Sequence, residues 1–334
     1  MDGKQVTMKD VAMAMGVSIV TVSKALADKE GVSEDLRVKI IEKAKELGYV
    51  AKGEKKRDAA PINIGIIISD RFIGGNSFYA MIYQKMIMEL TARRYIGITE
   101  VVRVEDEEDG ILPNIVRNNS VSQVVVVGEM KSIFLENLIK TGLGIIFFDF
   151  ENEEFDVDSI VSDGVKGGFL LTRHLVKRGH QKIGFVGNYK STRSILDRYM
   201  GYLKYLIAKD RLVSEDWCVS DRDEYGELID LVLPKDMPDA FVCNCDVVAY
   251  RLIEKLEQMG YSVPQDVSVV GYDDFVGQAP RSIGLTTYRV DTEMMIQHCM
   301  HIIEKRAENP EYRRGSTVVY GTLVERDTVR MRES

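Results

Sequence analysis

The chain has 334 residues, 45% of them hydrophobic, and a formal net charge of −8. This composition is that of a globular protein long enough for a small domain and a larger one, and it excludes a disordered or fibrous chain. No apolar run reaches the ~18 residues of a membrane span, and residues 1–10 lack a signal-peptide core, so we expect a cytoplasmic protein with no membrane contact.

Residues 7–26, TMKDVAMAMGVSIVTVSKAL, predict two short helices joined by a tight turn. Thr7 is placed to cap the first helix, and Asp10 lies in its first turn, where amide groups are unpaired. Gly16 is expected where the first helix ends, and Ser18 where the second begins. The polar residues left on the outer face, where a helix-turn-helix meets DNA, are Thr21, Ser23 and Lys24.

A third helix is predicted over residues 33–47, with Ser33 as its cap and Gly48 at its end. Three short helices in this space indicate a DNA-binding headpiece, although the helix-glycine-helix pattern alone leaves an ordinary helical hairpin open. Residues 1–58 hold 12 Lys and Arg against 10 Asp and Glu, whereas the remainder holds 32 against 42. Because the headpiece is only mildly basic, we expect DNA affinity to depend on dimerisation and to fall steeply with salt.

Residues 52–61, KGEKKRDAAP, are a predicted linker. From residue 62 onward, strand and helix patterns alternate, which indicates parallel sheets covered on both faces. The predicted strands are 62–69, 96–103, 123–127, 144–148, 182–186, 217–220, 239–244, 267–272 and 317–324. The predicted helices are 77–92, 110–118, 132–141, 164–178, 194–208, 225–233, 247–260 and 292–306.

Polar residues follow several of these strands at their carboxyl ends, where open α/β sheets bind ligands. Carboxylate and amide groups that meet there suit a polyhydroxylated ligand. The polar residues at these strand ends are Ser69, Asp70, Arg71, Glu129, Asp149, Asn188, Asn244, Asp246, Asp273 and Asp274. Aromatic side chains that could stack on a sugar ring are Phe78, Tyr79 and Phe275.

Some candidates also have structural interpretations that the sequence leaves open. Asp149 is alternatively a loop cap, Asp246 a helix cap and Tyr79 a core residue, whereas Asp274 is expected to be structural. Other residues are predicted to pack rather than to bind or catalyse: Trp217, His174 and His180.

The cysteines show no zinc-binding spacing. Cys243 and Cys245 have one residue between them at a predicted strand end, and no histidine or cysteine cluster accompanies them. We therefore expect Cys218, Cys243, Cys245 and Cys299 to be reduced thiols, with no metal site and no cofactor.

Two headpiece segments, DVAMAMGVSIVTVSKAL and GVSEDLRVKIIEKAKELGY, resemble the lactose-repressor/galactose-repressor (LacI/GalR) family of bacterial transcription regulators. RHLVKRGHQKIGFVG, VPQDVSVVGYDDF and LTTYRVD resemble that family's sensor-domain blocks in order and spacing. The resemblance implies an α/β protein with a three-helix helix-turn-helix headpiece and a two-lobed, doubly wound domain like the periplasmic binding proteins. It also implies a homodimer that binds palindromic double-stranded operator DNA and represses carbohydrate genes under the control of a sugar.

The domains implied are a headpiece at residues 1–51, a linker at 52–61 and an effector-binding and dimerisation domain at 62–334. Within that domain, lobe one is expected at about 62–158 and 290–312, and lobe two at about 159–289 and 313–330. No heptad segment follows Arg330, so a dimer is expected rather than a tetramer.

The resemblance also assigns individual residues. Arg198, in DRYMGY, matches the arginine that reaches the sugar, with a structural salt bridge as the alternative. Asn244 and Asp273 match residues that hold ligand hydroxyls, and Asp70 occupies the contact position after the first strand. In the headpiece, Ile19 and Val20 match base-reading positions and alternatively fill the seam between helices, whereas Thr7 and Ser18 suit phosphate contacts.

The linker departs from the family pattern, because no leucine lies between Val50 and Ile62 to wedge into the minor groove. We expect this segment instead to follow phosphates through Lys55, Lys56 and Arg57, and to bend DNA less.

Two other function classes would explain part of the sequence. A sugar-processing enzyme would explain the carboxylates at the strand ends, but GxSxG, HExxH, Walker and GxGxxG motifs are absent and we assign no catalytic residue. A transport-associated sugar-binding protein would require export and would not need a headpiece.

Overall fold

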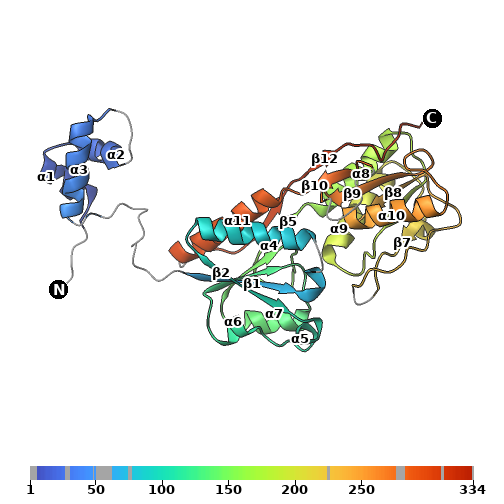
Figure 1. The fold of residues 1–334 in the computed structure, drawn as a ribbon, viewed down its shortest axis with the longest axis horizontal. Coiled ribbons are helices and arrows are strands. Elements are labelled where there is room, and N and C mark those ends of the chain that lie inside the picture. The colour runs from blue at the N-terminus through green and yellow to red at the C-terminus, as the bar shows by residue number, and fades with distance from the viewer. Residues whose placement is uncertain are drawn as a thin grey trace. The chain divides into compact units, whose positions relative to one another are not determined.

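The computed structural model describes residues 6–26, 31–47, 49, 62–73, 77–223, 226–275, 283–309 and 312–332. The chain forms two compact units, Met1–Pro61 and Ile62–Ser334 (Figure 1). The linker residues that we expect to follow phosphates, Lys55, Lys56 and Arg57, lie outside the described residues.

The described residues of the first unit form three helices, α1 (Met8–Met15), α2 (Ile19–Leu26) and α3 (Glu34–Glu46). The ends predicted for the first two helices are confirmed, whereas Gly48, the predicted end of the third, lies outside the described residues. The Asp10 carboxylate accepts hydrogen bonds from the Thr7 backbone N–H at 2.7 Å and from its hydroxyl at 2.6 Å. Gly16 ends α1 with a left-handed φ of 66°, and the Ser18 hydroxyl accepts from the Thr21 N–H at 3.0 Å. The buried core consists of Val11, Ala12, Val22, Ala25, Ile40 and Ala44.

The second unit contains two six-stranded sheets. In the first sheet the order is β11 (Ser316–Val319), β5 (Asp158–Ser162), β4 (Gly144–Phe148), β3 (Gln123–Val127), β1 (Asn63–Ser69) and β2 (Ile96–Val102). In the second it is β12 (Thr322–Val324), β10 (Thr286–Arg289), β9 (Ser268–Asp273), β8 (Ala240–Cys243), β6 (Ile183–Val186) and β7 (Cys218–Val219). All pairs are parallel except β10 with β12.

Helices cover both faces of each sheet, as the buried apolar strands require. Around the first sheet lie α4 (Phe78–Ala92), α5 (Val104–Glu108), α6 (Asn114–Arg117), α7 (Ser132–Ile139) and α11 (Thr292–Glu308). Around the second lie α8 (Gly164–Lys177), α9 (Arg193–Ala208) and α10 (Asp246–Gln258). Figure 1 shows α4 and α11 on one side of the first sheet and α5, α6 and α7 on the other.

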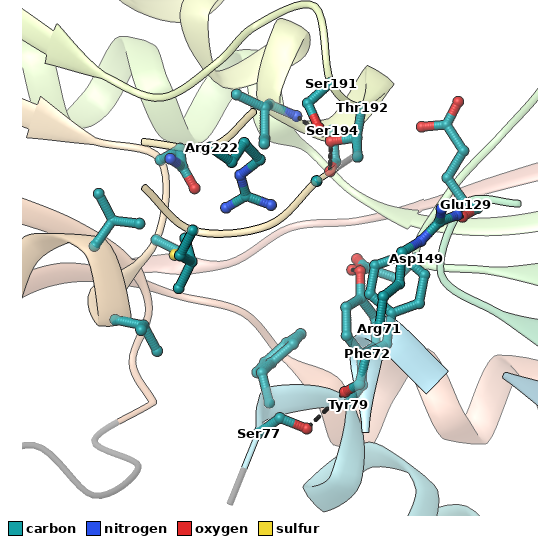
Figure 2. Close-up of a pocket in the computed structure, with 18 of the residues that line it drawn as sticks. Arg71, Phe72, Ser77, Tyr79, Glu129, Asp149, Ser191, Thr192, Ser194 and Arg222 are labelled. Carbon is teal, nitrogen blue, oxygen red and sulfur yellow. Dashed lines mark hydrogen bonds between the residues drawn. The ribbon is translucent and has the colours of Figure 1, made fainter. Parts of the chain in front are cut away.

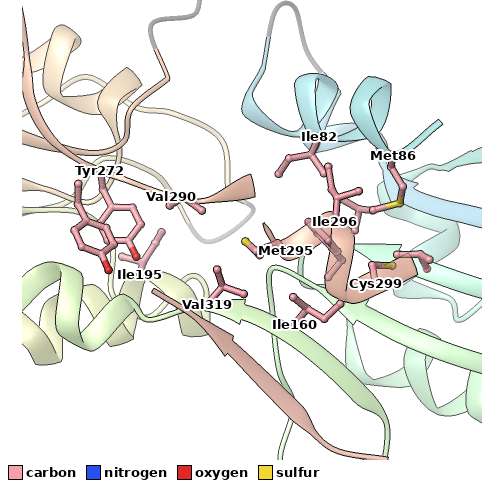
Figure 3. Close-up of a cluster of buried hydrophobic side chains, with 14 of the residues drawn as sticks. Ile82, Met86, Ile160, Ile195, Tyr272, Val290, Met295, Ile296, Cys299 and Val319 are labelled. Carbon is pink, nitrogen blue, oxygen red and sulfur yellow. The ribbon is translucent and has the colours of Figure 1, made fainter. Parts of the chain in front are cut away.

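Alternation along β1 explains this two-sided packing. Ile66 and Ile68 belong to the cluster that contains Met86 of α4, whereas Ile67 belongs to the cluster that contains Phe134 of α7. The first of these clusters continues past Val290 and Val319 into the second lobe, where it includes Tyr272 and Ile195 (Figure 3). The two lobes therefore share a continuous apolar core where the chain crosses between them.

The structure corrects the predicted helix at residues 225–233. Residues 226–233 form no helix; instead Arg222 and Leu228 make an antiparallel bridge, and the Ile229 N–H donates to the Asp221 carbonyl. Gly226 has a φ of 89°, which turns the chain back on itself. This hairpin buries Leu231 in the core beside α10, which a helix on the surface would not do.

Three further differences concern the first sheet. Within the predicted helix at 110–118, only α6 is helical, and a further helix, α5, precedes it. The strand β5 was not predicted, so the first lobe continues through residue 162 rather than ending at 158. The predicted strand at 317–324 is two strands, and β11 joins the first sheet rather than the second. The break comes at Gly321, where an added Cβ would lie 2.1 Å from the Arg289 carbonyl oxygen.

All four cysteines are free, as predicted. Cys243 packs in the core beneath α10, whereas Cys245, two residues further on, lines a cavity at the carboxyl end of β8.

Candidate functional site

The outer face of α2 carries the predicted DNA-contacting residues. Ile19 and Val20 are 47% and 64% exposed, so they do not fill the seam between helices. The other predicted contacts on this face are exposed or half-buried: Ser18, Thr21, Ser23 and Lys24. Thr7, at the start of α1, is exposed as well. The headpiece therefore offers apolar side chains, hydroxyls and an ammonium group on one short helix and its flanks.

A cavity of about 430 Å³ lies between the two sheets of the second unit, at the carboxyl ends of their strands. Its lining combines four cations, three carboxyl groups, several hydroxyls and three aromatic side chains. In Figure 2, Arg222 and the hydroxyl residues of 191–194 face Glu129, Asp149 and Tyr79 across the cavity. This volume falls within the about 300–1,000 Å³ typical of small-molecule sites.

Five of the seven predicted effector residues line this cavity: Phe78, Asp149, Arg198, Asn244 and Asp273. Asp70 does not; it is exposed at the start of a 3-10 turn over Asp70–Phe72. This turn brings Arg71 and Phe72 to the cavity instead. Phe275 is also outside the lining, and its ring packs edge-on against Phe78 with centroids 6.0 Å apart.

Arg198 is the most enclosed cation of the site, with 7% exposure. One Nη donates to the Asn244 carbonyl at 2.6 Å, and the other lies 3.7 Å from the Asp273 carboxylate. The guanidinium also stacks 3.9 Å above the Tyr272 ring, while its Nε has no protein partner. Burial acts to lower the pKa of Arg198, but Asp273, Tyr272 and Asp149 raise it overall, so the side chain stays charged. Arg198 therefore forms the predicted alternative, a salt bridge, and also lines the cavity.

The two buried aspartates of the cavity are poorly stabilised as anions. Burial raises the pKa of Asp149 despite the opposing effects of Arg198 and of the Tyr79 hydroxyl, which donates to it at 2.8 Å. Burial raises the pKa of Asp273 well above its usual value, and its Oδ1 has no hydrogen-bond partner. Both residues have positive φ values, 67° and 111°. The Asp273 Oδ1, an acceptor without a hydrogen-bond partner in the cavity lining, suits a hydroxyl donor from a ligand.

The structure places Arg71, a strand-end candidate, in the lining and adds residues that the sequence did not indicate, namely Lys131, Ser191, Thr192, Ser194 and Arg222. Arg222 follows the short edge strand β7, and residues 191–194 follow β6 through a loop. Both segments lie at the carboxyl ends of strands, where open α/β sheets bind ligands. Inspection of the residues after every predicted strand would therefore have found them. Glu129, a strand-end candidate that is not one of the seven predicted effector residues, is also in the lining.

The alternative interpretation of Asp246 as a helix cap is wrong, because Cys245 is the N-cap of α10 and Asp246 is the first residue of the helix. Asp246 lies outside the cavity lining and accepts from the Thr287 hydroxyl at 2.6 Å and the Phe275 N–H at 2.7 Å. Asp274 pairs with Arg289 at 2.7 Å and with Arg326 at 2.6 Å.

The remaining structural candidates are enclosed. Trp217 is 2% exposed and His180 is 1% exposed, with its Nδ1 3.2 Å from Asp239. His174, 7% exposed, lies 3.6 Å from Glu325.

Within the described ranges, no group of three or more potential ligands could hold a metal ion. Over the same part of the chain, every helix is too short or too polar to span a bilayer.

A helix-turn-helix unit followed by a two-sheet unit with a polar cavity defines a ligand-regulated DNA-binding protein. Residues 7–52 match the model of the bacterial regulatory proteins of the lacI family, and residues 172–329 match a periplasmic binding protein-like domain. The chain therefore carries a DNA-binding domain of the lacI family type and a periplasmic binding protein-like domain.

Named relatives span nearly the whole chain. The HTH-type transcriptional repressor PurR of Vibrio cholerae serotype O1 (strain M66-2) is 26% identical over 342 residues, which cover 97% of this chain and 98% of the relative. PurR of Pectobacterium carotovorum subsp. carotovorum (strain PC1) is 27% identical over 343 residues, covering 97% and 96%.

Solved structures share the fold. The transcriptional regulator CelR–cellobiose complex has a TM-score of 0.68 at 20% identity and covers 97% of this chain and 100% of the other. The lac repressor dimer bound to operator and the anti-inducer ONPF has a TM-score of 0.65 at 22% identity, covering 98% and 100%. A LacI family regulator from Enterococcus faecium with bound ribose has a TM-score of 0.66 at 20% identity, covering 81% and 100%.

Proposed function

We propose that this protein is a homodimeric repressor that binds a palindromic operator in the cytoplasm and responds to a sugar bound in the cavity between its two lobes. The observation that carries the sugar is the cavity wall, where Arg198, Asp149 and Asp273 hold donors and acceptors aimed at a shared space of about 430 Å³. The sugars named with the CelR and Enterococcus faecium structures support this class of ligand.

The DNA-reading surface proposed is the exposed face of α2. Ile19 and Val20 project where a recognition helix meets base edges, and as apolar groups they suit thymine methyl groups. Thr7 and Ser18, at the two helix starts, are proposed to contact phosphates. Neither apolar residue can donate a hydrogen bond, so sequence preference is expected to depend on thymine positions and on DNA shape.

The regulatory mechanism proposed is a population shift. The cavity takes Asp149 from the first lobe and Arg198 from the second, so a bound sugar contacts both and favours one relative orientation. In a dimer, that orientation sets the spacing of the headpieces against two operator half-sites. Only a ligand with different contacts in the two states can move this equilibrium. The protein acts by binding, and no catalytic role is proposed for the cavity carboxylates.

The test uses the full-length protein in two stages. First, duplexes are selected from a library of palindromes, and operator affinity is measured by fluorescence anisotropy. Second, sugars including cellobiose and ribose are screened for a rise in melting temperature and for a change in operator affinity. Arg198→Ala is expected to lose the sugar response and to keep operator binding, whereas Val20→Ser is expected to alter operator preference and to keep the sugar response. Absence of preference for any palindrome would refute the proposal.

A further inference from the structure

The cations of the cavity are already paired within the protein. Arg71 lies 2.7 Å from Glu107, which is wholly buried. Arg222 donates to the equally buried Asp221 at 2.8 and 3.0 Å.

The other two cations are paired as well. Arg198 faces Asp273, and Lys131 lies 3.7 Å from Glu108. Among the described lining residues, every arginine and lysine thus has a carboxylate of its own. A phosphate or carboxylate on the ligand would find each of these cations already within 4 Å of a carboxyl group of the protein.

The amino end of α9 is the other place in the cavity wall where an anion is expected to bind, because the first N–H groups of this 16-residue helix have no partner within the helix itself. Glu129 already occupies it. Its carboxylate, reaching across from the end of β3, accepts from the Arg193 N–H at 2.8 Å and from the Arg193 Nε at 3.3 Å. Glu129 comes from the first lobe and Arg193 from the second, so the protein's own carboxylate takes the position that an anionic ligand would need.

From this arrangement we infer that the effector is an uncharged sugar, and that Glu129 excludes sugar phosphates and sugar acids from the cavity. The inference rests on the proposed function. An anionic ligand would meet the carboxyl groups of Glu129, Asp149 and Asp273 in the lining, and Glu129 already occupies the helix end where the anion would otherwise bind. A neutral sugar meets no charge repulsion in this environment, because its hydroxyls can both donate and accept hydrogen bonds.

The experiment compares matched pairs of neutral and charged ligands by isothermal titration calorimetry with the full-length protein. The pairs are glucose with glucose 6-phosphate and glucuronate, ribose with ribose 5-phosphate, and cellobiose with cellobionate. For the pair whose neutral member binds, the charged member is expected to bind at least about 100-fold more weakly, since like charges brought together at a binding surface cost several kcal/mol.

The variant Glu129→Gln keeps the side-chain shape and removes the charge, so it is expected to narrow this ratio by about tenfold or more. Glu136→Gln is the matched control, because Glu136 lies on α7 outside the cavity lining and pairs only loosely with Lys140 at 3.9 Å. It should leave the ratio unchanged. Melting curves show whether each variant is folded. If Glu129→Gln does not fold, the ratio of neutral to charged ligand affinity in the wild type still tests the inference.

The outcomes separate the two proposals. A charged member that binds the wild type as tightly as its neutral partner overturns the exclusion and leaves a sugar-responsive repressor standing. An unchanged ratio in folded Glu129→Gln overturns the role of Glu129. Failure of every ligand, neutral or charged, to bind overturns the sugar proposal and the inference together.

Discussion

Replacing Arg198 with alanine should leave the Asp273 carboxylate buried without its cation. The pair is enclosed, with side chains 8% and 9% exposed, and its atoms lie 3.7 Å apart. Breaking a buried pair from one side costs about 3–5 kcal/mol, and the long separation here favours the lower end. For a domain of this size that corresponds to a fall in melting temperature of roughly 6–12 °C.

A second substitution separates the loss of the charge pair from the loss of packing. Asp273→Asn removes the carboxylate, and asparagine tolerates the positive φ of 111° better than most residues do. The double variant Arg198→Ala with Asp273→Asn is therefore expected to recover about half or more of the lost stability. Scanning calorimetry of the four proteins at one pH gives the coupling.

The stability lost in Arg198→Ala is expected to depend on pH. Burial raises the pKa of Asp273 in the folded protein, so the folded state holds this proton more tightly than the unfolded state does. Its favourable contribution is present below the ordinary carboxyl pKa and is lost as pH rises through the raised value. Without Arg198 the pKa of Asp273 rises further, so the penalty should be smaller at pH 5 than at pH 8. Equal penalties at both pH values, with no rescue by Asp273→Asn, would refute this account.

Three other outcomes follow from local geometry. Gly168→Ala puts a Cβ 2.1 Å from the Arg198 carbonyl, so overpacking of about 1–3 kcal/mol and weaker sugar binding are expected, by denaturant titration and calorimetry. Ile19→Ser with Val20→Ser should change operator preference in a duplex selection without lowering the melting temperature, because both side chains are exposed. Burial raises the pKa of Asp246 to about 7, so the wild type should lose stability relative to Asp246→Asn as pH rises from 4 to 7; parallel pH profiles would contradict this.

The headpiece could be predicted from the sequence because its signals are local. Thr7 and Asp10 cap α1 from three residues apart, and Gly16 ends it in a conformation that glycine adopts without strain. The strands β3 and β4 were predicted at their observed bounds for a similar reason, since short apolar runs buried on both faces have few alternatives.

Prediction was poorer where distant partners decide the local structure. Residues 226–233 carry a helical pattern, yet burial of Leu231 and the bridge between Arg222 and Leu228 make them a hairpin. The acidic stretch of α5 resembles a surface loop, but Glu107 is buried there to pair with Arg71.

What the sequence determined by itself is the chemistry available at each strand end, since the strand pattern places polar residues at one edge of each sheet. The tertiary structure decided which of them face the cavity. A turn of three residues exposes Asp70 and brings Arg71 inward, and positive φ values hold Asp149 and Asp273 at the wall. The reason is physical: a side chain's direction depends on the backbone angle and on partners such as Glu107 and Arg198 that are far away in sequence.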